Sequence, residues 1–393
     1  MNPPISPIKP PLSDDEDRPS PESDPKPQPH AKARADHKPL SAFLVDHSDT
    51  IGMSWQEIDA LRPPFIIDQF LRRGEVMLLG AESKSRKSWL AQDAEIAVAA
   101  GLPWLADEDG ENGFTTAQAR VHVLDLELNS SEMRFRFAKA RGNRFKDCPE
   151  DAAAITARIS AYSFDGMNVL DIMPRLEELK ATAQPGDLVI VDCLYRLVPD
   201  GNETKDVAEI LETVKRFAAG TQAGVIVVDH FRKAGDDKAR NRFAGSFVKQ
   251  ASASTLVAIE AKGDDILALN IDARTFHGCP LVHARFNPET YSFDRVTEED
   301  AQASRTASAA AEIEGWLVAL WRFRDLAARV TLADAMEKWK LTRPGCDGRM
   351  KKMEGGAIQL EAGRTGSAKA WTLTETGKGI VGKALNFHPH LHP

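Results

Sequence analysis

A lysine and a serine stand together where a short apolar run gives way to a helical pattern. The run covers Val76–Leu79, Gly80 ends it, and a polar loop then leads to Lys87 and Ser88. Backbone N–H groups at the start of a helix attract anions, and a lysine beside them adds a positive charge. A serine hydroxyl in the same place can ligate Mg²⁺. These residue types in this order predict a loop that holds the phosphates of a nucleotide, with a helix behind it.

The loop departs from the usual phosphate-binding spacing, in which glycine stands six residues before the lysine and again directly before it. Those positions hold Ala81 and Arg86, and Gly80 comes one residue early. A residue other than glycine at positive φ costs roughly 1–2 kcal/mol, so these departures bear on the rate of hydrolysis. The alternative interpretation is a polar turn that ends in lysine and serine by chance. The residues assigned to phosphate binding are Gly80, Ser83, Lys84, Ser85, Arg86, Lys87, Ser88 and Trp89.

Glu127, Asp192 and His230 each stand at the end of a later apolar run. Strands that are apolar throughout are typical of parallel sheets, whose carboxyl ends share the edge where ligands bind. Glu127 is therefore expected to orient or deprotonate a water against the γ-phosphate. Asp192 is expected to hold Mg²⁺, and His230 to contact the γ-phosphate. Each has a structural alternative, because polar residues at strand ends are common without any such role.

A basic loop over residues 232–242 follows His230 directly, with five cations against two anions. A basic, glycine-containing loop at this edge of a sheet suits a nucleic-acid strand, so single-stranded DNA is an expected partner. A solvated loop is the alternative. Arg242, Arg274 and Arg285 are candidates for an arginine that reaches a neighbouring subunit and stabilises the transferred phosphoryl group. The sequence does not choose among them.

The elements that must position these residues alternate between strand and helix patterns. The predicted strands cover 76–79, 121–126, 155–162, 187–192, 224–230, 255–259, 266–271 and 281–286. This order predicts an α/β fold with a mostly parallel twisted sheet, extended by short antiparallel strands. Residues 40–73 form a lead-in that is expected to pack against the first strand.

Changes in composition divide the chain into five predicted segments. Residues 1–38 are proline-rich with an acidic run and are expected to be disordered. Residues 39–291 hold the sheet and its lead-in, 292–310 form a linker, and 311–385 form a second domain. The tail at 386–393 alternates histidines, which suggests a metal site or, more simply, a frayed end.

The second domain shows the order helix, helix, helix, hairpin, which is that of a winged helix-turn-helix. Its third helix offers Arg343, Arg349, Lys351 and Lys352. Basic side chains on one helix favour contacts with phosphates, so duplex DNA or a partner protein is the expected ligand of this domain.

Composition limits the other classes of function. The formal net charge of −8 argues against a uniformly basic nucleic-acid binder and leaves room for a local basic surface. The four cysteines are scattered without metal-site spacing, which indicates reduced thiols and a cytoplasmic protein. No apolar stretch is long enough to span a membrane, and the first residues lack the apolar core of a signal peptide.

Taken together, these features resemble the RecA-like P-loop ATPases, most closely the RepA-type hexameric helicases of plasmids and the related AAA-labelled ATPases of mobile elements. The resemblance covers roughly residues 60–290 and depends on the order and spacing of several motifs. The residues that carry it are Gly80, Lys87–Leu90, Leu126–Glu127, 189–192, 228–230, Arg242–Ser246 and Ala273–Thr275.

The resemblance implies ATP and Mg²⁺ as cofactors, with Ser88 and Asp192 on the metal side. It implies Glu127 as the catalytic base, His230 as the sensor, and Arg274 or its rival Arg242 as the finger. The function implied is that of a hexameric DNA-replication helicase that hydrolyses ATP to move on single-stranded DNA. One alternative is an ATP-gated DNA-binding regulator, such as a replication initiator or a recombination mediator. Another is an interaction scaffold that does not hydrolyse ATP.

Overall fold

The computed structural model describes most of the chain. The described residues are 44–45, 47–167, 169–197, 204–230, 247–262, 265–276, 281–324, 329–361 and 369–384. The predicted disordered arm, the basic loop with Arg242 and the histidine tail lie outside these ranges. The chain divides into two compact units, with the boundary between Asp59 and Ala60. The first unit contains a short 3-10 helix (Ser48–Thr50) and most of α1 (Trp55–Ala60).

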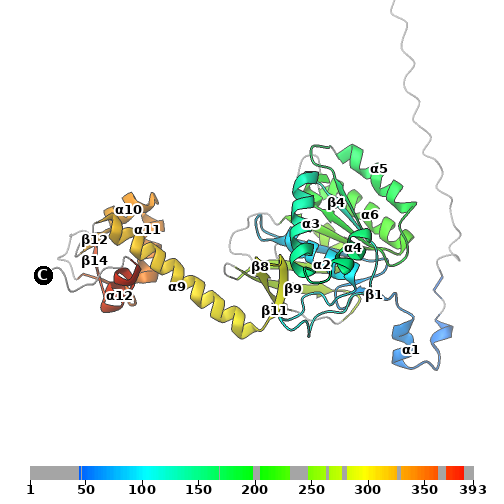
Figure 1. The fold of residues 1–393 in the computed structure, drawn as a ribbon, viewed down its shortest axis with the longest axis horizontal. Helices are drawn as coiled ribbons and strands as arrows, with labels where there is room; N and C mark the ends of the chain where they lie inside the picture. Colours follow the sequence, from blue (N-terminus) through cyan, green and yellow to red (C-terminus); the bar gives the residue numbers. More distant parts are fainter. Residues whose placement is uncertain are drawn as a thin grey trace, which may run out of the picture. The chain divides into compact units, whose positions relative to one another are not determined.

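A nine-stranded sheet forms the centre of the second unit (Figure 1). Its strand order is β11-β10-β9-β8-β3-β7-β6-β4-β5. Neighbouring strands from β8 to β5 are parallel, and those from β8 to β11 are antiparallel. The strands are β3 (Val76–Ala81), β4 (Val121–Asp125), β5 (Ile159–Ser163), β6 (Leu188–Asp192), β7 (Gly224–His230), β8 (Thr255–Ala261), β9 (Ile266–Ala273), β10 (Leu281–Asn287) and β11 (Ser292–Val296). The predicted α/β fold with a mostly parallel sheet is confirmed.

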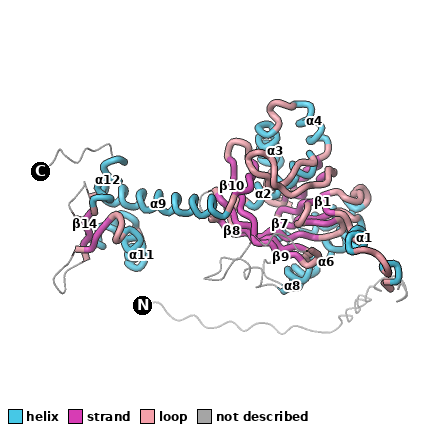
Figure 2. The backbone as a smooth tube through the Cα atoms, turned by 90° about the horizontal axis from the view of Figure 1, so that it is seen from below, coloured by secondary structure: helices cyan, strands magenta, loops and turns pink. Residues whose placement is uncertain are grey.

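Helices cover both faces of this sheet. In Figure 2, α2, α3 and α4 lie on one side of the strands, and α6 and α8 lie on the other. The helices are α2 (Lys87–Ala100), α3 (Ser130–Arg144), α4 (Pro149–Ala157), α5 (Val169–Lys180), α6 (Thr204–Thr221) and α8 (Phe247–Ser252). A parallel sheet covered in this way buries every residue of its central strands, which explains their continuous apolar sequences.

Successive side chains of β3 belong to the two hydrophobic cores on opposite faces of the sheet. Met77 and Leu79 belong to the core that contains Leu90 of α2. Val76 and Leu78, one residue out of step, belong to the core that contains helices α5 and α6. Successive side chains of a strand point to opposite faces, so one strand supports both layers.

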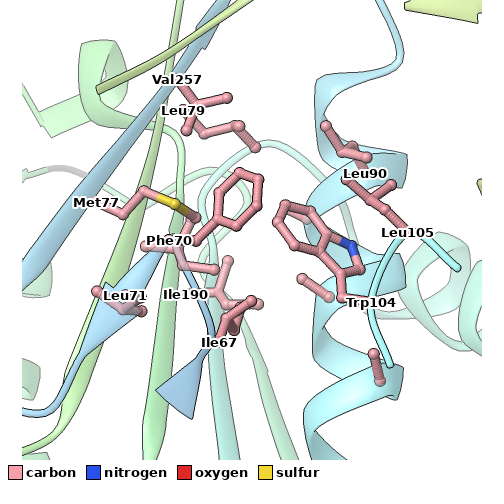
Figure 3. Close-up of a cluster of buried hydrophobic side chains, with 14 of the residues drawn as sticks. Ile67, Phe70, Leu71, Met77, Leu79, Leu90, Trp104, Leu105, Ile190 and Val257 are labelled. Carbon is pink, nitrogen blue, oxygen red and sulfur yellow. The ribbon is translucent and has the colours of Figure 1, made fainter. Parts of the chain in front are cut away.

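The lead-in fills one end of the first core (Figure 3). Its two short strands, β1 (Phe65–Ile67) and β2 (Leu71–Arg72), flank Phe70, whose side chain is fully buried. The Phe70 ring meets the ring of Trp104 edge to face, with 4.8 Å between the centroids. Both residues share a cluster with Met77 and Leu79 of β3. The predicted packing of the lead-in against the first strand is confirmed.

The segment 292–310, which was predicted to be a linker, forms regular secondary structure. It forms β11 and the first half of α9 (Glu298–Phe323). Phe293 of β11 is buried in the first core, and Thr297 caps α9 in a reciprocal pair with Asp300. The alanine and serine content that suggested a linker reflects a helix with small side chains, because alanine has the highest helix propensity.

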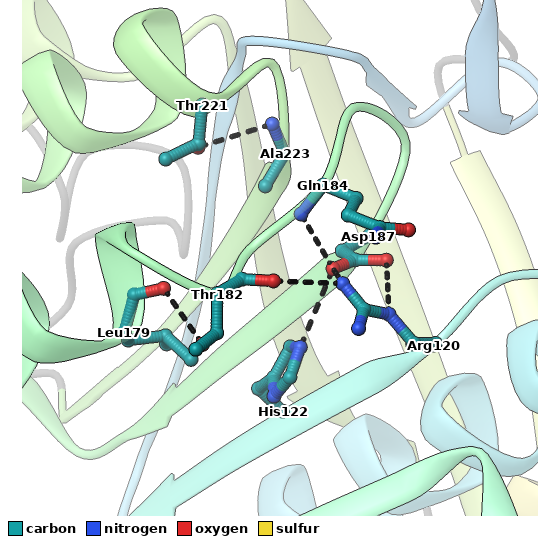
Figure 4. A network of polar contacts seen from close by, with 8 residues as sticks. All are labelled: Arg120, His122, Leu179, Thr182, Gln184, Asp187, Thr221 and Ala223. Carbon is teal, nitrogen blue, oxygen red and sulfur yellow. Dashed lines mark hydrogen bonds and ion pairs between the residues drawn. The ribbon is translucent and has the colours of Figure 1, made fainter.

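One polar network joins strands at the amino edge of the sheet (Figure 4). Asp187 precedes β6 and accepts hydrogen bonds from Arg120, which precedes β4, at 2.6 and 3.2 Å. The ring of His122 lies 3.4 Å from the same carboxylate. Burial would raise the pKa of Asp187, but hydrogen bonds from His122, Arg120 and the backbone of Gln184 lower it to about 2. The network therefore ties β4 to β6 at the end opposite the predicted site.

The C-terminal residues build a smaller core of their own. After α9 come β12 (Val330–Thr331), α10 (Leu332–Trp339), α11 (Arg343–Met353), β13 (Ile358–Leu360), β14 (Ala370–Leu373) and α12 (Glu375–Ala384). The three strands form an antiparallel sheet of order β12-β14-β13. The predicted helices and hairpin strands are present, and their assignment to a winged helix stays a prediction. Within the described ranges, no helix is both long and apolar enough to cross a bilayer.

Candidate active site

The predicted phosphate loop lies between the carboxyl end of β3 and the start of α2. Lys84 and Arg86 adopt positive φ values of 64° and 61° within it. Left-handed backbone costs a residue other than glycine about 1–2 kcal/mol. Arg86 therefore adopts a left-handed backbone conformation that glycine would adopt without this cost, and the loop carries local strain.

Packing of the Arg86 side chain offsets part of this strain. Its guanidinium lies over the ring of Phe286, 4.8 Å from the centroid, and 3.4 Å from a carboxylate oxygen of Asp265. Both partners belong to the antiparallel side of the sheet. The residue that replaces glycine thus fastens the loop to a neighbouring part of the core.

Strand register explains why the distant polar residues meet. Ala81, the last residue of β3, pairs with His230 at the end of β7. Asp125 at the end of β4 pairs with Asp192 at the end of β6. Asp192 pairs with Val228, so β4 and β6 stop two residues before β3 and β7. All four strands end at the edge where the loop begins, as the sequence predicted.

Glu127 is placed by the turn that ends β4. The carboxylate of Asp125 accepts hydrogen bonds from the backbone N–H groups of Glu127 and Leu128, at 2.9 and 2.8 Å. Tyr195, on a 3-10 turn after β6, donates a hydrogen bond of 2.6 Å to Oε1 of Glu127. Two separate contacts thus fix the backbone and the carboxylate of this residue.

Lys87, His230 and Glu127 form one cluster above the loop. The Nζ atom of Lys87 lies 3.0 Å from the ring nitrogens of His230. His230 Nε2 lies 3.6 Å from Oε1 of Glu127, and the ring of Tyr195 meets the ring of His230 edge to face at 4.9 Å. The structure brings together the predicted phosphate ligand, the predicted base and the predicted sensor.

The charges of this cluster suit those roles. Burial alone would raise the pKa of Glu127, but the Tyr195 hydroxyl and the neighbouring His230 and Lys87 lower it below its usual value. Burial and the Lys87 ammonium together lower the pKa of His230. At neutral pH the carboxylate is therefore ionised and the imidazole neutral, so Glu127 can accept a proton and His230 can donate a hydrogen bond.

Asp192 and Ser88 supply oxygen atoms of the kind that Mg²⁺ prefers. The Asp192 side chain is buried, and its Oδ1 has no hydrogen-bond partner among the described residues. Burial, together with the nearby Asp125 and Glu127, raises the pKa of Asp192 to about 7, although a hydrogen bond with Ser88 lowers it. A divalent cation would satisfy the unpaired oxygen and favour the ionised carboxylate, so these residues fit the metal.

A cavity of about 270 Å³ lies over the loop. It is lined by Glu127, Asp192, His230 and every predicted loop residue from Ser83 to Trp89. Gly80 does not line it, because this residue lies inside β3, paired with Asp229 and Ala258. The loop proper therefore begins after Ala81.

Two residues of the cavity region were not predicted. Arg136 of α3 lines the cavity and lies over the ring of Trp89, 4.7 Å from the centroid. Its i,i+4 spacing from Glu132 predicts the ion pair that forms at 3.0 Å, but no pattern indicates the cavity. Tyr195 carries no signal in the sequence, because its contact with Glu127 depends on the turn that follows β6.

The candidate arginines are not brought into this cluster. Arg274 follows β9 at the opposite edge of the sheet, where its guanidinium donates a 3.2 Å hydrogen bond to the carbonyl of Ala251. Arg285 of β10 lies 3.8 Å from Glu108, and Arg242 lies outside the described residues. A role for any of them in a neighbouring subunit stays a prediction.

A second cavity, of about 240 Å³, adjoins the first beneath α3. Its walls are mostly apolar, and they share Ser88 and Asp192 with the loop cavity. Glu95 of α2 lines it with a side chain that is 6% exposed. Burial, together with the nearby Asp125, raises the pKa of Glu95 to about 8.

Part of this chain is similar to a known protein family. A family model described as an AAA domain matches residues 52–236, a segment that contains Lys87, Glu127, Asp192 and His230. No curated protein matches the chain.

Two solved structures are similar to this chain at low sequence identity. One, described as an ATPase domain, is 14% identical, with a TM-score of 0.46, over 64% of this chain and 98% of that one. A DnaB-like replicative helicase, solved in a study of its interactions with primase, is 15% identical. Its TM-score is 0.47, over 64% of this chain and 67% of that one.

Proposed function

We propose that this protein binds ATP with Mg²⁺ and hydrolyses it to drive movement on single-stranded DNA. The observation that carries the proposal is the meeting of Lys87, Glu127 and His230 in one cavity at the start of a helix, beside Ser88 and Asp192. The cavity combines anion-binding backbone, a lysine, a carboxylate base and oxygen donors for a metal. Phosphoryl transfer needs this set of groups, because its catalysis consists mainly of positioning and charge stabilisation.

Each residue has a defined part in the proposed reaction. Lys87 and the N-terminus of α2 hold the phosphates, and Glu127, oriented by Tyr195, aligns a water for attack on the γ-phosphate. Ser88 and Asp192 hold Mg²⁺, which supplies positive charge to the phosphate oxygens. The phosphates compete with His230 for Lys87, so His230 is freed to hydrogen-bond the γ-phosphate when ATP binds.

The link from His230 to DNA follows from chain connectivity. His230 is the last residue of β7, and the basic loop 232–242 begins two residues after it. A change at the γ-phosphate thus reaches the predicted DNA-binding loop through the backbone. We further propose a hexameric ring in the cytoplasm, in which an arginine from one subunit completes the neighbour's site. The C-terminal residues would bind duplex DNA or a partner protein.

The first test measures ATP binding and phosphate release with and without single-stranded DNA. In the intact chain we expect release that DNA stimulates. Lys87→Ala should lower it by about 10³-fold, since losing a preorganised charge in such a site costs about 3–4 kcal/mol. Lys215→Ala, on an exposed position of α6, is the matched control and should behave as the parent. Equal turnover in the two variants would remove the assignment of the loop.

An ATP-gated regulator is the second candidate, and the loop itself favours it. Two strained residues other than glycine and a Lys87 held by His230 are consistent with slow turnover. A strand-displacement assay separates the two candidates, because a regulator would show ATP-dependent DNA binding without displacement. Light scattering with and without ATP and Mg²⁺ tests the ring, since a monomer in every condition would exclude an arginine supplied by a neighbour.

A further inference from the structure

Three different metal-binding side chains converge beside the phosphate loop. Cys193 directly follows β6, and its thiol lies with Glu127 and His230 so that the three ligand atoms are all within 4.8 Å of one another. The Glu127 and His230 atoms are 3.6 Å apart. Among the described residues this is the one group of three that mixes sulfur, nitrogen and oxygen ligands in this way.

We propose that Glu127, Cys193 and His230 form a binding site for Zn²⁺ that switches the ATPase off. The geometry is close to what the ion requires. Tetrahedral zinc with one sulfur, one nitrogen and one oxygen ligand places those atoms about 3.3–3.7 Å apart, given bonds of about 2.0–2.3 Å. The widest separation here, at most 4.8 Å, exceeds this range by about 1 Å, which side-chain rotation can close. A water completes the fourth position.

The ligand set selects a soft or borderline metal over Mg²⁺. Sulfur and imidazole ligands suit zinc, whereas Mg²⁺ takes oxygen ligands in an octahedron and keeps its waters. Excess Mg²⁺ in an ATPase reaction would therefore occupy the Ser88 and Asp192 side and leave this site open to Zn²⁺. The two metals have separate sites that meet at the end of β6.

Charge balance also supports the ion, and two features oppose it. Burial, together with the nearby Asp192 and Glu127, raises the pKa of the Cys193 thiol, which must lose its proton. The ionised Glu127 and the Cys193 thiolate neutralise Zn²⁺, and the thiol proton leaves to solvent. Lys87 opposes the ion, because its ammonium lies 3.0 Å from the ring nitrogens of His230. Removing that ammonium should therefore tighten zinc binding, which is a result that a merely damaged fold would not give.

Zinc should inhibit ATP hydrolysis because two of its ligands are the proposed base and the proposed sensor. A carboxylate bound to zinc cannot align a water, and an imidazole bound to zinc cannot contact the γ-phosphate. Inhibition by zinc rests on the proposed function, but the binding of zinc does not. Separate measurements of zinc binding and of ATPase activity therefore distinguish a failure of the site from a failure of the proposed function.

The binding test uses the full chain without nucleotide, titrated with Co²⁺ as a spectroscopic substitute for Zn²⁺. A bound thiolate gives cobalt a sulfur-to-metal charge-transfer band that histidine and carboxylate ligands do not give. The tail histidines His388, His390 and His392 can bind cobalt but cannot produce this band. We expect the band in the parent chain, its removal by Zn²⁺, and its loss in Cys193→Ser.

Matched variants identify the cysteine that gives rise to the charge-transfer band. Cys148→Ser, Cys279→Ser and Cys346→Ser change the other three cysteines and should keep it. Lys87→Met should keep it at a lower cobalt concentration. A band that survives in Cys193→Ser, or no band in the parent chain, would overturn the site. Thermal unfolding of Cys193→Ser checks that the variant is folded, and His230→Gln, expected to weaken the band, is a second route if it is not.

The activity test follows phosphate release in excess Mg²⁺ as Zn²⁺ is added. The parent chain should lose activity and regain it on chelation. In Cys193→Ser the inhibitory concentration should rise at least tenfold, since even changes outside the metal's own ligands cost about that much affinity. Equal inhibition of both proteins, with the cobalt band intact in the parent, would leave the site standing and refute the switch.

Discussion

Tyr195 donates its hydroxyl to Oε1 of Glu127, and this contact decides where the proposed base points. The turn that carries Tyr195 follows β6 closely, so the same strand end carries Asp192, the proposed metal ligand, and a hydroxyl that orients the proposed base. The site therefore depends on one short segment for two functions.

Variants of Glu127 and Tyr195 should lower the turnover rate to different extents. Glu127→Gln should lower kcat by about 10²–10⁴-fold, the usual contribution of a general base, and leave ATP affinity nearly unchanged. Tyr195→Phe keeps the base and loses its orientation, so a loss of about tenfold is expected, the worth of one hydrogen bond to a charged group. Steady-state phosphate release with equilibrium dialysis of ATP measures both. Full turnover in Glu127→Gln would assign the base elsewhere.

Glu95 has a measurable effect on stability, because its pKa is raised from 4.5 to about 8. A carboxyl group whose pKa is raised in the folded chain does not change the free energy of unfolding below pH 4.5, because it is neutral in both states. Between pH 4.5 and 8 it lowers the free energy of unfolding progressively, and above pH 8 this loss is constant. Glu95→Gln should therefore match the parent near pH 4.5 and be more stable at pH 8, by at most about 5 kcal/mol.

Denaturant unfolding at the two pH values tests this prediction. Glu212→Gln, on an exposed position of α6, is the matched control and should show no such difference. A Glu95→Gln chain that is less stable than the parent at pH 8 would mean that the ionised carboxylate has a partner that stabilises it.

At the residue scale, sequence reasoning succeeded where a polar side chain ends an apolar strand. Glu127, Asp192 and His230 were predicted to lie at one edge in this way, because strand ends in a parallel sheet share one edge. Lys87 was predicted from the loop before the helix, and the roles of all four residues stay predictions. Tyr195 and Glu95 were not predictable, since one depends on a turn conformation and the other lies inside an apolar helix sequence that gives no sign of a cavity.

At the scale of elements, the sequence predicted most of the strands in their order along the chain, but it did not predict their boundaries. The predicted strand 155–162 begins at Ile159 instead, because the residues before it complete α4, which starts at Pro149. Proline is favoured in the first turn of a helix, so Pro149 is the signal that marks this helix in the sequence. Register, by contrast, depends on contacts between distant segments and cannot be read from local patterns.

The Asp187 network gives a prediction for the pairing of β4 and β6. A lowered pKa in the folded chain means that the ionised carboxylate stabilises the fold above pH 3.8, and that this contribution is lost as pH falls toward 2. For a side chain that is 5% exposed, a shift from 3.8 to about 2 corresponds to about 2 kcal/mol.

Asp187→Asn should therefore be about 2 kcal/mol less stable than the parent at pH 7, with a smaller gap near pH 2. Urea unfolding at both values measures the free energy of unfolding. Glu178→Gln, in an exposed pair with Arg175 on α5, is the control and should change stability little. An equal loss at both pH values would assign the effect of Asp187→Asn to packing rather than to charge.

At the scale of the whole molecule, the proposed functions divide between the sheet and the C-terminal core. Arg343 and Lys351 of α11 are exposed, although the Arg343 guanidinium lies 3.9 Å from a carboxylate oxygen of Asp347, so both charges can reach a phosphate backbone. Arg349 lies over the rings of Trp316 and Trp339, at 4.8 and 5.2 Å, which gives it a structural part.

The double variant Arg343→Ala, Lys351→Ala should weaken duplex DNA binding at low salt. The slope of log affinity against log salt should fall by about 2, since each phosphate contact contributes about 0.9. ATP hydrolysis without DNA should not change. Fluorescence anisotropy over a salt series measures the slope, with Lys215→Ala as control. An unchanged slope would leave a partner protein as the ligand of this domain.

The continuous helix α9 has one more consequence. Its 26 residues extend about 39 Å, and most side chains between Gln302 and Glu312 are exposed. Each residue removed from that stretch turns everything beyond it by about 100° about the helix axis, while removing seven restores nearly the original azimuth. If the ligand of the C-terminal core must face the nine-stranded sheet in a set direction, DNA-stimulated turnover should rise and fall with a period of three to four deleted residues. A flexible tether would give a smooth decline instead.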